Sequence, residues 1–336
     1  MVTDKGIVLL MGGDPLYVKL TFNLSSMIKR SLGSYPITVL YDDESILYTM
    51  YKNYPSLIVE SLIDSFVKIP KEYLYLDNSG IKHFGLTKVN AYKLSPYKKT
   101  IFLDVDSAIF GHADVFSCIT DINLPLMFQC DYYSTAINAI ENEYNIIVWA
   151  KFPELFSNKD VRKFIAVDIA GTGIFQLKSF FFYFEKNDDS KKYFEFADLS
   201  YRFLYENHKK LNLKTWINGT IPDELAFFMS LLSNEKMTEL FKKQFVREPT
   251  TNVVTDVFTP MYVLYNKEIE YVVQLMMMHG SDPKYMGMTM PGKLTQSGIS
   301  FYNKIAIMSQ MYSCIDVKKI TLSEEDALNK PGEWNV

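Results

Sequence analysis

The stretch Ile101-Phe102-Leu103-Asp104-Val105-Asp106-Ser107 carries the sharpest signal in the sequence. Three apolar residues predict a buried strand, and two aspartates stand at its C-terminal end, the edge at which open α/β sheets bind ligands. Side chains at i and i+2 of an extended segment point to the same side, so Asp104 and Asp106 can face one divalent cation together. Oxygen ligands suit Mg²⁺ or Mn²⁺. A solvated turn is the alternative interpretation of this spacing.

Apolar runs and amphipathic segments alternate on both sides of this stretch, which predicts strands and helices in turn. We expect strands at 7–11, 37–41, 66–69, 100–104, 125–130, 172–177, 261–264 and 274–279. We expect helices at 15–32, 44–51, 86–94 and 223–232, with the aromatic cluster 180–184 in a further helix against the core. This alternation favours an α/β fold with a mixed, mostly parallel sheet flanked by helices.

The composition is that of a globular protein, with 336 residues, 48% hydrophobic and 22% charged. The net charge is −4, so the chain lacks the overall excess of basic residues expected of a protein that binds nucleic-acid phosphate backbones. The three cysteines, Cys118, Cys130 and Cys314, match neither a zinc site nor a disulfide framework, which favours free thiols in a reducing compartment. With no run of eighteen apolar residues, we expect no integral membrane segment. The reducing compartment, with a composition rich in Tyr, Phe, Asn, Lys and Ile and poor in Ala and Gly, leads us to expect a cytoplasmic protein of a bacterium or an infected host cell.

The residues around the aspartates form a recognisable succession. Leu86-Thr87-Lys88 begins a predicted helix, the basic turn 96–99 follows, and Asp114-Val115-Phe116 comes after the aspartates. This succession resembles the glycogenin-like retaining glycosyltransferases, family 8 of that enzyme class. Further segments agree with the family order over residues 5 to 290: 7–14 with Tyr17, 37–42, 171–175, 222–225, and 278–280 with Lys284.

The resemblance implies a GT-A fold, Rossmann-like and specialised for nucleotide-diphospho-sugars. Residues 1–290 would form the catalytic domain, and 291–336 a C-terminal extension packed on it. It implies a UDP-sugar donor, Mn²⁺ as cofactor with Mg²⁺ as the alternative, and transfer with retention to a hydroxyl acceptor. A glycan, a lipid, a protein or a modified nucleic-acid base would all fit as acceptor.

The resemblance also implies roles for particular residues. Asp104, Asp106 and His279 would hold the metal, and Asp223, Glu224 and Lys284 would be catalytic. The donor would be bound by Leu10, Met11, Gly12, Tyr17, Lys88, Asp104, Val105, Asp106, Gly280 and Lys284. From the residues themselves, Tyr17 fits either stacking on uracil or core packing, and the lysines fit a solvated surface equally well.

The sequence departs from the family at several positions. Glu224 stands where the family has Gln, which leaves open front-face attack or a transient carboxylate nucleophile. Asp223 and Glu224 also suit a plain first turn of a helix, where the dipole favours acids. Gly171 replaces an Asn, and the closing motif runs Asp282-Pro283-Lys284-Tyr285 in place of a Lys-Pro-Trp ending. These changes bear on the donor sugar and the acceptor.

Two other functions compete with this interpretation. A sugar-1-phosphate nucleotidyltransferase would open with a glycine-rich loop carrying a basic residue, but Met11-Gly12-Gly13-Asp14 offers an acid. A non-catalytic nucleotide-sugar-binding module would have no need of the metal and lysine positions, all of which are present here.

Overall fold

A computed structural model describes residues 4–13, 16–31, 34–76, 82–105, 107–110, 126–133, 159–165, 174–211, 221, 223–234, 260–262 and 274–279. The catalytic domain expected at 1–290 is described in these parts, and the extension expected at 291–336 lies outside the described residues.

The main sheet of the described part has six strands in the order β3-β2-β1-β6-β9-β8. Their bounds are β1 (Lys5–Met11), β2 (Ile37–Tyr41), β3 (Ser65–Lys68), β6 (Lys99–Asp104), β8 (Leu126–Tyr133) and β9 (Ile174–Glu185). β1 runs parallel to β2 and β6, and β2 runs parallel to β3. β9 is antiparallel to both β6 and β8. The predicted mixed, mostly parallel sheet is therefore confirmed.

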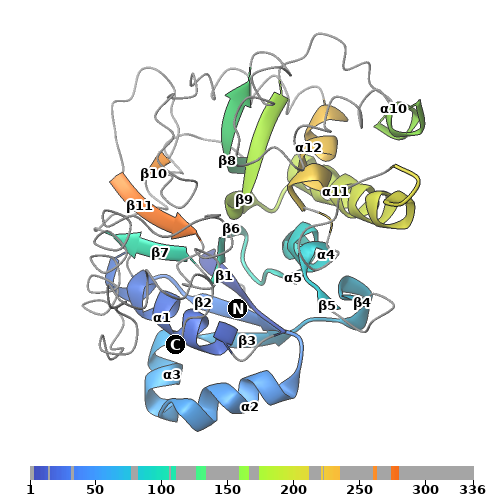
Figure 1. The fold of residues 1–336 in the computed structure, drawn as a ribbon. Coiled ribbons are helices and arrows are strands. Elements are labelled where there is room, and N and C mark those ends of the chain that lie inside the picture. The colour runs from blue at the N-terminus through green and yellow to red at the C-terminus, as the bar shows by residue number, and fades with distance from the viewer. Residues whose placement is uncertain are drawn as a thin grey trace, which may run out of the picture.

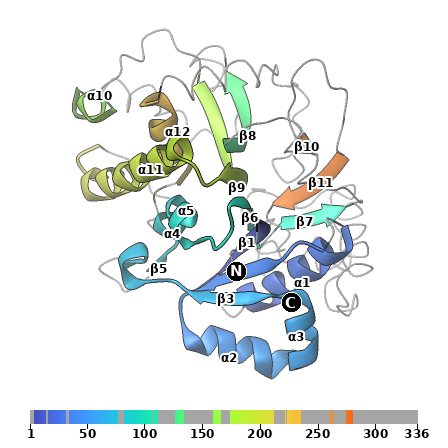
Figure 2. The same ribbon diagram turned by 180° about the vertical axis from the view of Figure 1, so that it is seen from behind.

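Helices cover both faces of the parallel part of this sheet (Figures 1 and 2). One side carries α1 (Leu16–Ser31), α2 (Glu44–Asn53) and α3 (Ser56–Leu62). The other carries α4 (Gly85–Val89), α5 (Ala91–Leu94), α11 (Asp188–Asn207) and α12 (Asp223–Leu232), with α10 (Lys159–Ile165) beside them. Among the described residues, every helix is too short or too polar to span a lipid bilayer.

Strand alternation divides the core into two clusters. On β1, Ile7, Leu9 and Met11 pack toward α1, α2 and α3. Val8 and Leu10 pack toward α4, α11 and α12 instead. This period of two is the pattern expected of an extended strand buried on both faces, and it explains why β1 reads as a continuous apolar run.

Two small antiparallel sheets complete the described strands. β7 (Ser107–Phe110) pairs with β11 (Gln274–His279), which pairs in turn with β10 (Pro260–Tyr262). β4 (Tyr75–Leu76) pairs with β5 (Lys82–His83) after the short 3-10 turn η1 (Lys71–Tyr73). The β7–β11 pair matters for the site because its register sets His279 opposite Ser107.

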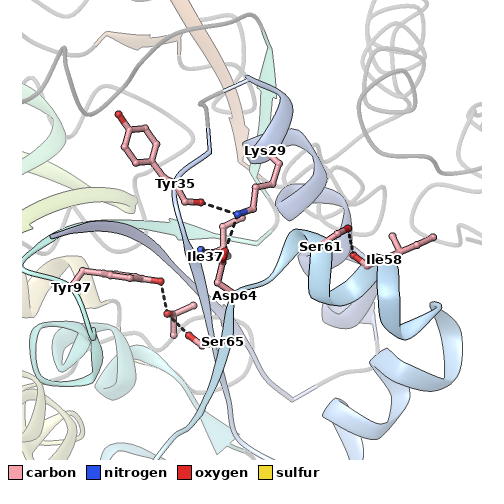
Figure 3. Close-up of polar contacts among 9 residues, drawn as sticks. Lys29, Tyr35, Ile37, Ile58, Ser61, Asp64, Ser65 and Tyr97 are labelled. Atoms are coloured by element: carbon pink, nitrogen blue, oxygen red, sulfur yellow. Dashed lines mark hydrogen bonds and ion pairs between the residues drawn. The ribbon is translucent and has the colours of Figure 1, made fainter. Parts of the chain in front are cut away.

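Polar contacts fix the edge of the sheet at which β2 and β3 begin (Figure 3). The Asp64 carboxylate accepts hydrogen bonds from the Ile37 amide and the Lys29 ammonium, each at 2.8 Å. Nearby, the Thr38 hydroxyl lies 2.7 Å from both the Ser65 and the Tyr97 hydroxyl oxygens. These contacts satisfy buried polar groups at the edge opposite the predicted ligand site, and we assign them a structural role.

The helix expected for residues 180–184 is wrong, because these residues belong to strand β9. Phe182 and Phe184 pack on one face of the sheet, and Phe181 and Tyr183 on the other. A strand buried on both faces shows no apolar–polar alternation, so its sequence cannot be told from a buried helix by period alone.

The helix expected at 86–94 forms but breaks at Asn90 into α4 and α5. The Asn90 side-chain amide donates to the Leu86 carbonyl at 2.9 Å and to the Asp198 carboxylate at 2.9 Å. A side chain that bonds the backbone of the preceding turn competes with continued helix. The same contacts join α4 to α11, the long helix that the sequence reading did not anticipate.

Candidate active site

Four residues from the sequence prediction gather at the C-terminal end of β6. Lys88 projects from α4, Asp104 is the last residue of β6, and Asp223 and Glu224 form the first turn of α12. The Lys88 ammonium nitrogen lies 2.6 Å from Oδ2 of Asp104 and 3.6 Å from Oδ2 of Asp223. All three of these side chains are largely buried. We call these four residues the lysine–carboxylate cluster.

The alternation of β6 sets the direction of Asp104. Ile101 and Leu103 pack toward α1, whereas Phe102 packs toward α4 and α12. Two residues on from Phe102, Asp104 meets Lys88 of α4 on that same face. Because the strand ends here, the carboxylate lies at the edge of the sheet rather than within the core.

Helix α12 has two acids in its first turn and buried residues along the rest of its length. All eight residues from Leu225 to Leu232 are buried, which anchors the helix against β9 and α11. Asp223 and Glu224 stand at its N-terminus, where the helix dipole favours negative charge. The first-turn interpretation of these acids is therefore correct as geometry, and it coexists with their place in the cluster.

Ser179 of β9 joins the cluster although the sequence reading missed it. Its hydroxyl donates to Oε1 of Glu224 at 2.9 Å, and the Lys88 ammonium lies 3.4 Å from its oxygen. The register of β9 against β8 shifts here, so Phe128 pairs with Phe182 and Gln129 with Lys178. Ser179 thus lies in a bulge-like irregularity, a feature that redirects side chains beside functional sites.

Burial and charge act in opposition within the cluster. Burial raises the pKa of Glu224, and the negative charge of Asp223 raises it further, to about 7 despite the nearby Lys88. Burial lowers the pKa of Lys88, but the carboxylates of Asp104, Asp223 and Glu224 outweigh that effect and raise it. Lys88 is therefore charged at neutral pH, while Glu224 is balanced between its two protonation states.

The residues predicted to contact the nucleotide lie at the adjacent end of β1. Leu10 pairs with Asp104 on β6 and with Leu40 on β2, so this strand end directly adjoins the cluster. Met11 and Val105 are buried in the core beneath α1, so their side chains serve packing. Tyr17 is half-buried and packs against the same core.

The loop after β1 depends on glycine. A Cβ on Gly12 would overlap the ring of Phe84, and Gly13 adopts a φ of +83° that favours glycine. The Gly13 amide donates to Asp42 at 3.4 Å, and the buried Asp42 carboxylate also accepts from Lys82 at 2.6 Å. The sequence prediction included Gly12 but not this supporting set of Phe84, Asp42 and Lys82.

The predicted metal ligands are described only in part. Asp106 lies outside the described residues, and of His279 the structure describes the backbone alone. That backbone pairs with Ser107, the residue after Asp106, which brings β11 to the end of the Asp104–Asp106 segment. Among the described side chains, no three potential ligands are arranged to hold a metal ion. Gly280 and Lys284 also lie outside the described residues.

No protein-family model matches the sequence, and the comparison with curated proteins finds no match. Solved structures of glycosyltransferases do resemble the fold. The galactosyltransferase LgtC, in complex with donor and acceptor sugar analogues, aligns at a TM-score of 0.39 and 10% identity over 67% of this chain and 70% of its own. Mouse xyloside xylosyltransferase 1 in its apo form aligns at 0.37 and 12%, over 69% and 83%.

The mannosyltransferase Ktr4p from S. cerevisiae aligns at a TM-score of 0.35 and 13% identity, over 58% of this chain and 60% of its own. These structural neighbours are glycosyltransferases, and each TM-score is below 0.5. We therefore take the function from the residues of the site.

Proposed function

We propose that this chain is a metal-dependent GT-A glycosyltransferase that transfers a sugar from a UDP-sugar to a hydroxyl acceptor, with retention at the transferred carbon. One observation carries the proposal: Lys88, Asp104, Asp223 and Glu224, chosen from sequence motifs as much as 136 positions apart, meet in one buried cluster at the ligand-binding edge of the sheet.

The charges of the cluster support a phosphate-bearing ligand with a cation. Among the described residues, one ammonium faces the carboxylates of Asp104 and Asp223 together with the carboxyl of Glu224, so the described charges of the cluster are net negative. Buried carboxylates in excess are costly unless a cation neutralises them. The donor chemistry therefore fits Mn²⁺ or Mg²⁺, held by Asp104 and Asp106 with His279 as the nitrogen ligand. When bound, such an ion neutralises the charge that develops on a departing diphosphate.

Lys88 and the two acids of α12 would act on the donor itself. Lys88 is within reach of both carboxylates that flank it, so it can turn its charge toward a diphosphate that arrives beside Asp104. Asp223 would accept hydrogen bonds from sugar hydroxyls. Glu224, held by Ser179, is a carboxyl poised to ionise near neutral pH, which suits proton transfer or transient attack on the sugar carbon.

Nucleotide-dependent stabilisation tests this proposal. We expect UDP with Mn²⁺ to raise the melting temperature, and ADP with Mn²⁺ to raise it much less, because a ligand that binds only the native state adds to its stability. Asp104→Asn should remove most of the UDP–Mn²⁺ shift. Asp188→Asn, which changes an exposed aspartate of α11, is the matched control and should keep it. Equal shifts with UDP and ADP, or an undiminished shift in Asp104→Asn, would count against the proposal.

A further inference from the structure

Tyr201 packs against α4, the short helix that carries Lys88 of the lysine–carboxylate cluster. It is a residue of α11, its side chain is 0% exposed, and its ring packs on the first residue of α4. A Cβ on Gly85 would lie 2.5 Å from Cε2 and 2.6 Å from the hydroxyl oxygen of Tyr201. The hydroxyl therefore touches the turn of α4 that carries Lys88, three residues beyond Gly85.

The Tyr201 hydroxyl is buried and forms no hydrogen bond with the described residues. Oδ2 of Asp223 is likewise buried, and in the described part of the chain its contact is the ion pair with Lys88 at 3.6 Å. A buried polar group without a hydrogen bond costs about 1–3 kcal/mol, so its presence calls for an explanation. Here a buried donor on α11 and a buried acceptor on α12 both lack a hydrogen bond among the described residues.

The neighbouring charges show that the hydroxyl lies within electrostatic reach of the cluster. Burial raises the pKa of Tyr201, the charge of Asp223 raises it further, and the charge of Lys88 lowers it. The hydroxyl thus stays protonated at neutral pH and remains a hydrogen-bond donor.

Tyr193 provides a comparison on the same helix. It is also buried, eight residues earlier on α11, but its hydroxyl donates to the Phe227 carbonyl at 2.8 Å. That hydrogen bond accounts for the Tyr193 hydroxyl as part of the packing between α11 and α12. No such contact accounts for the Tyr201 hydroxyl within the described residues.

We propose that Tyr201 is a positioning residue for Asp223: its hydroxyl donates to the Asp223 carboxylate once Lys88 has turned to the diphosphate of the donor. The inference rests on the proposed function, because it is the arriving donor that draws Lys88 away. Without a second donor, Asp223 would then be a buried carboxylate that has lost its counter-charge. A hydrogen bond from Tyr201 replaces that partner and orients the carboxylate toward the sugar.

Two matched variants, Tyr201→Phe and Tyr193→Phe, separate this role from packing. Each removes one hydroxyl from a buried ring of the same helix. Urea unfolding should show Tyr201→Phe to be as stable as the wild type or more stable, since no native hydrogen bond is lost. Tyr193→Phe should be less stable, because it leaves the Phe227 carbonyl without its donor.

Kinetics should show the opposite order. We would measure UDP release from UDP-glucose, UDP-galactose, UDP-N-acetylglucosamine and UDP-xylose with Mn²⁺ present. Tyr201→Phe should lower kcat roughly ten- to a hundredfold, the value of one hydrogen bond to a charged group, with a much smaller change in KM. Tyr193→Phe should retain the wild-type kcat for the folded fraction.

The outcomes distinguish the two proposals. An active wild type with an unchanged kcat in Tyr201→Phe, or a stability loss in Tyr201→Phe equal to that in Tyr193→Phe, overturns the role of Tyr201 and leaves the proposed function standing. A wild type that releases UDP from none of the four donors overturns the proposed function and the role of Tyr201 with it.

Discussion

At the scale of single residues, Lys88 holds the candidate site together. A buried ammonium is stable only where carboxylates compensate the loss of water, and Asp104 and Asp223 supply that compensation from two different elements. The protonation state of Glu224 is finely balanced at neutral pH, because burial and Asp223 oppose its ionisation while Lys88 favours it. The glutamate at this position, where the glycogenin-like glycosyltransferases have Gln, therefore has a physical consequence, which is a carboxyl that titrates near neutral pH.

Replacing Glu224 with Gln should change the pH dependence of stability. The pKa of Glu224 is about 7 in the native state, above the ordinary value of 4.5, so the native state binds more protons between these pH values. The contribution of the Glu224 carboxyl to the free energy of unfolding is therefore fully present below pH 4.5, and it is lost as the pH rises to about 7. Glu224→Gln should be more stable than the wild type at pH 8, by roughly 3 kcal/mol, and similar to it at pH 4.5.

Urea unfolding at the two pH values measures this difference. Glu60→Gln, at an exposed glutamate of α3, is the control and should match the wild type at both. A Glu224→Gln variant no more stable at pH 8 than the wild type would show that Glu224 titrates normally. The same variant also distinguishes a transient carboxylate nucleophile from front-face attack. If Glu224 is the nucleophile, Glu224→Gln must lose turnover, whereas front-face attack does not require that loss.

At the scale of elements, the site depends on how α4 sits against α11. α4 is only one turn and a half long, so its position comes from packing rather than from its own stability. Gly85 lets the Tyr201 ring lie against it, and Asn90 bonds Asp198 at its other end. These two contacts set where Lys88 enters the cluster.

Gly85→Ala should therefore be destabilising, against the usual direction. Alanine favours helix over glycine by about 1 kcal/mol, so an open position would gain stability. Here the added methyl meets the Tyr201 ring at 2.5 to 2.8 Å, and overpacking of this kind costs typically 1–3 kcal/mol. We expect Gly85→Ala to lower the free energy of unfolding by about 1–2 kcal/mol.

A double-mutant cycle with Tyr201→Leu checks the cause. Leucine lacks the ring atoms that the methyl would meet. The sum of the losses in the free energy of unfolding for the two single variants should therefore exceed the loss for the double variant. Additive losses, or a stabilising Gly85→Ala, would show that the contact between α4 and α11 is not tight.

Some residues of the candidate site could be predicted from the sequence, and others could not. Asp104 was predictable because it ends a strand with a clear apolar pattern, whereas Lys88 and the α12 acids were chosen from the resemblance to the glycogenin-like glycosyltransferases. Ser179 and Tyr201 were not, since Ser179 lies in an irregular part of β9 and Tyr201 in a helix whose role depends on packing against Gly85. The aromatic run at 180–184 misled the period argument because both of its faces are buried.

At the scale of the whole molecule, the fold places two kinds of chemistry on neighbouring strands. β1 ends in the loop of Gly12 and Gly13, which Asp42 and Phe84 support, and β6 ends in Asp104 of the lysine–carboxylate cluster. Parallel strands deliver both ends to one edge, so a nucleotide at β1 would carry its diphosphate toward β6. In the proposed function the two strand ends therefore act on one ligand.

Metal-dependent release of UDP is the measurement that tests whether the two strand ends bind one nucleotide-sugar. The purified chain of 336 residues, given each of the four UDP-sugars, should release UDP slowly with Mn²⁺, because water replaces the missing acceptor. EDTA should abolish the release, and Asp104→Asn or Asp106→Asn should lower its rate by orders of magnitude while the far-UV circular dichroism stays unchanged. Formation of UTP and sugar-1-phosphate when pyrophosphate is added, with no release of UDP, would indicate a nucleotidyltransferase instead. An equal rate in EDTA, or full activity in both aspartate variants, would contradict metal-dependent transfer at this site.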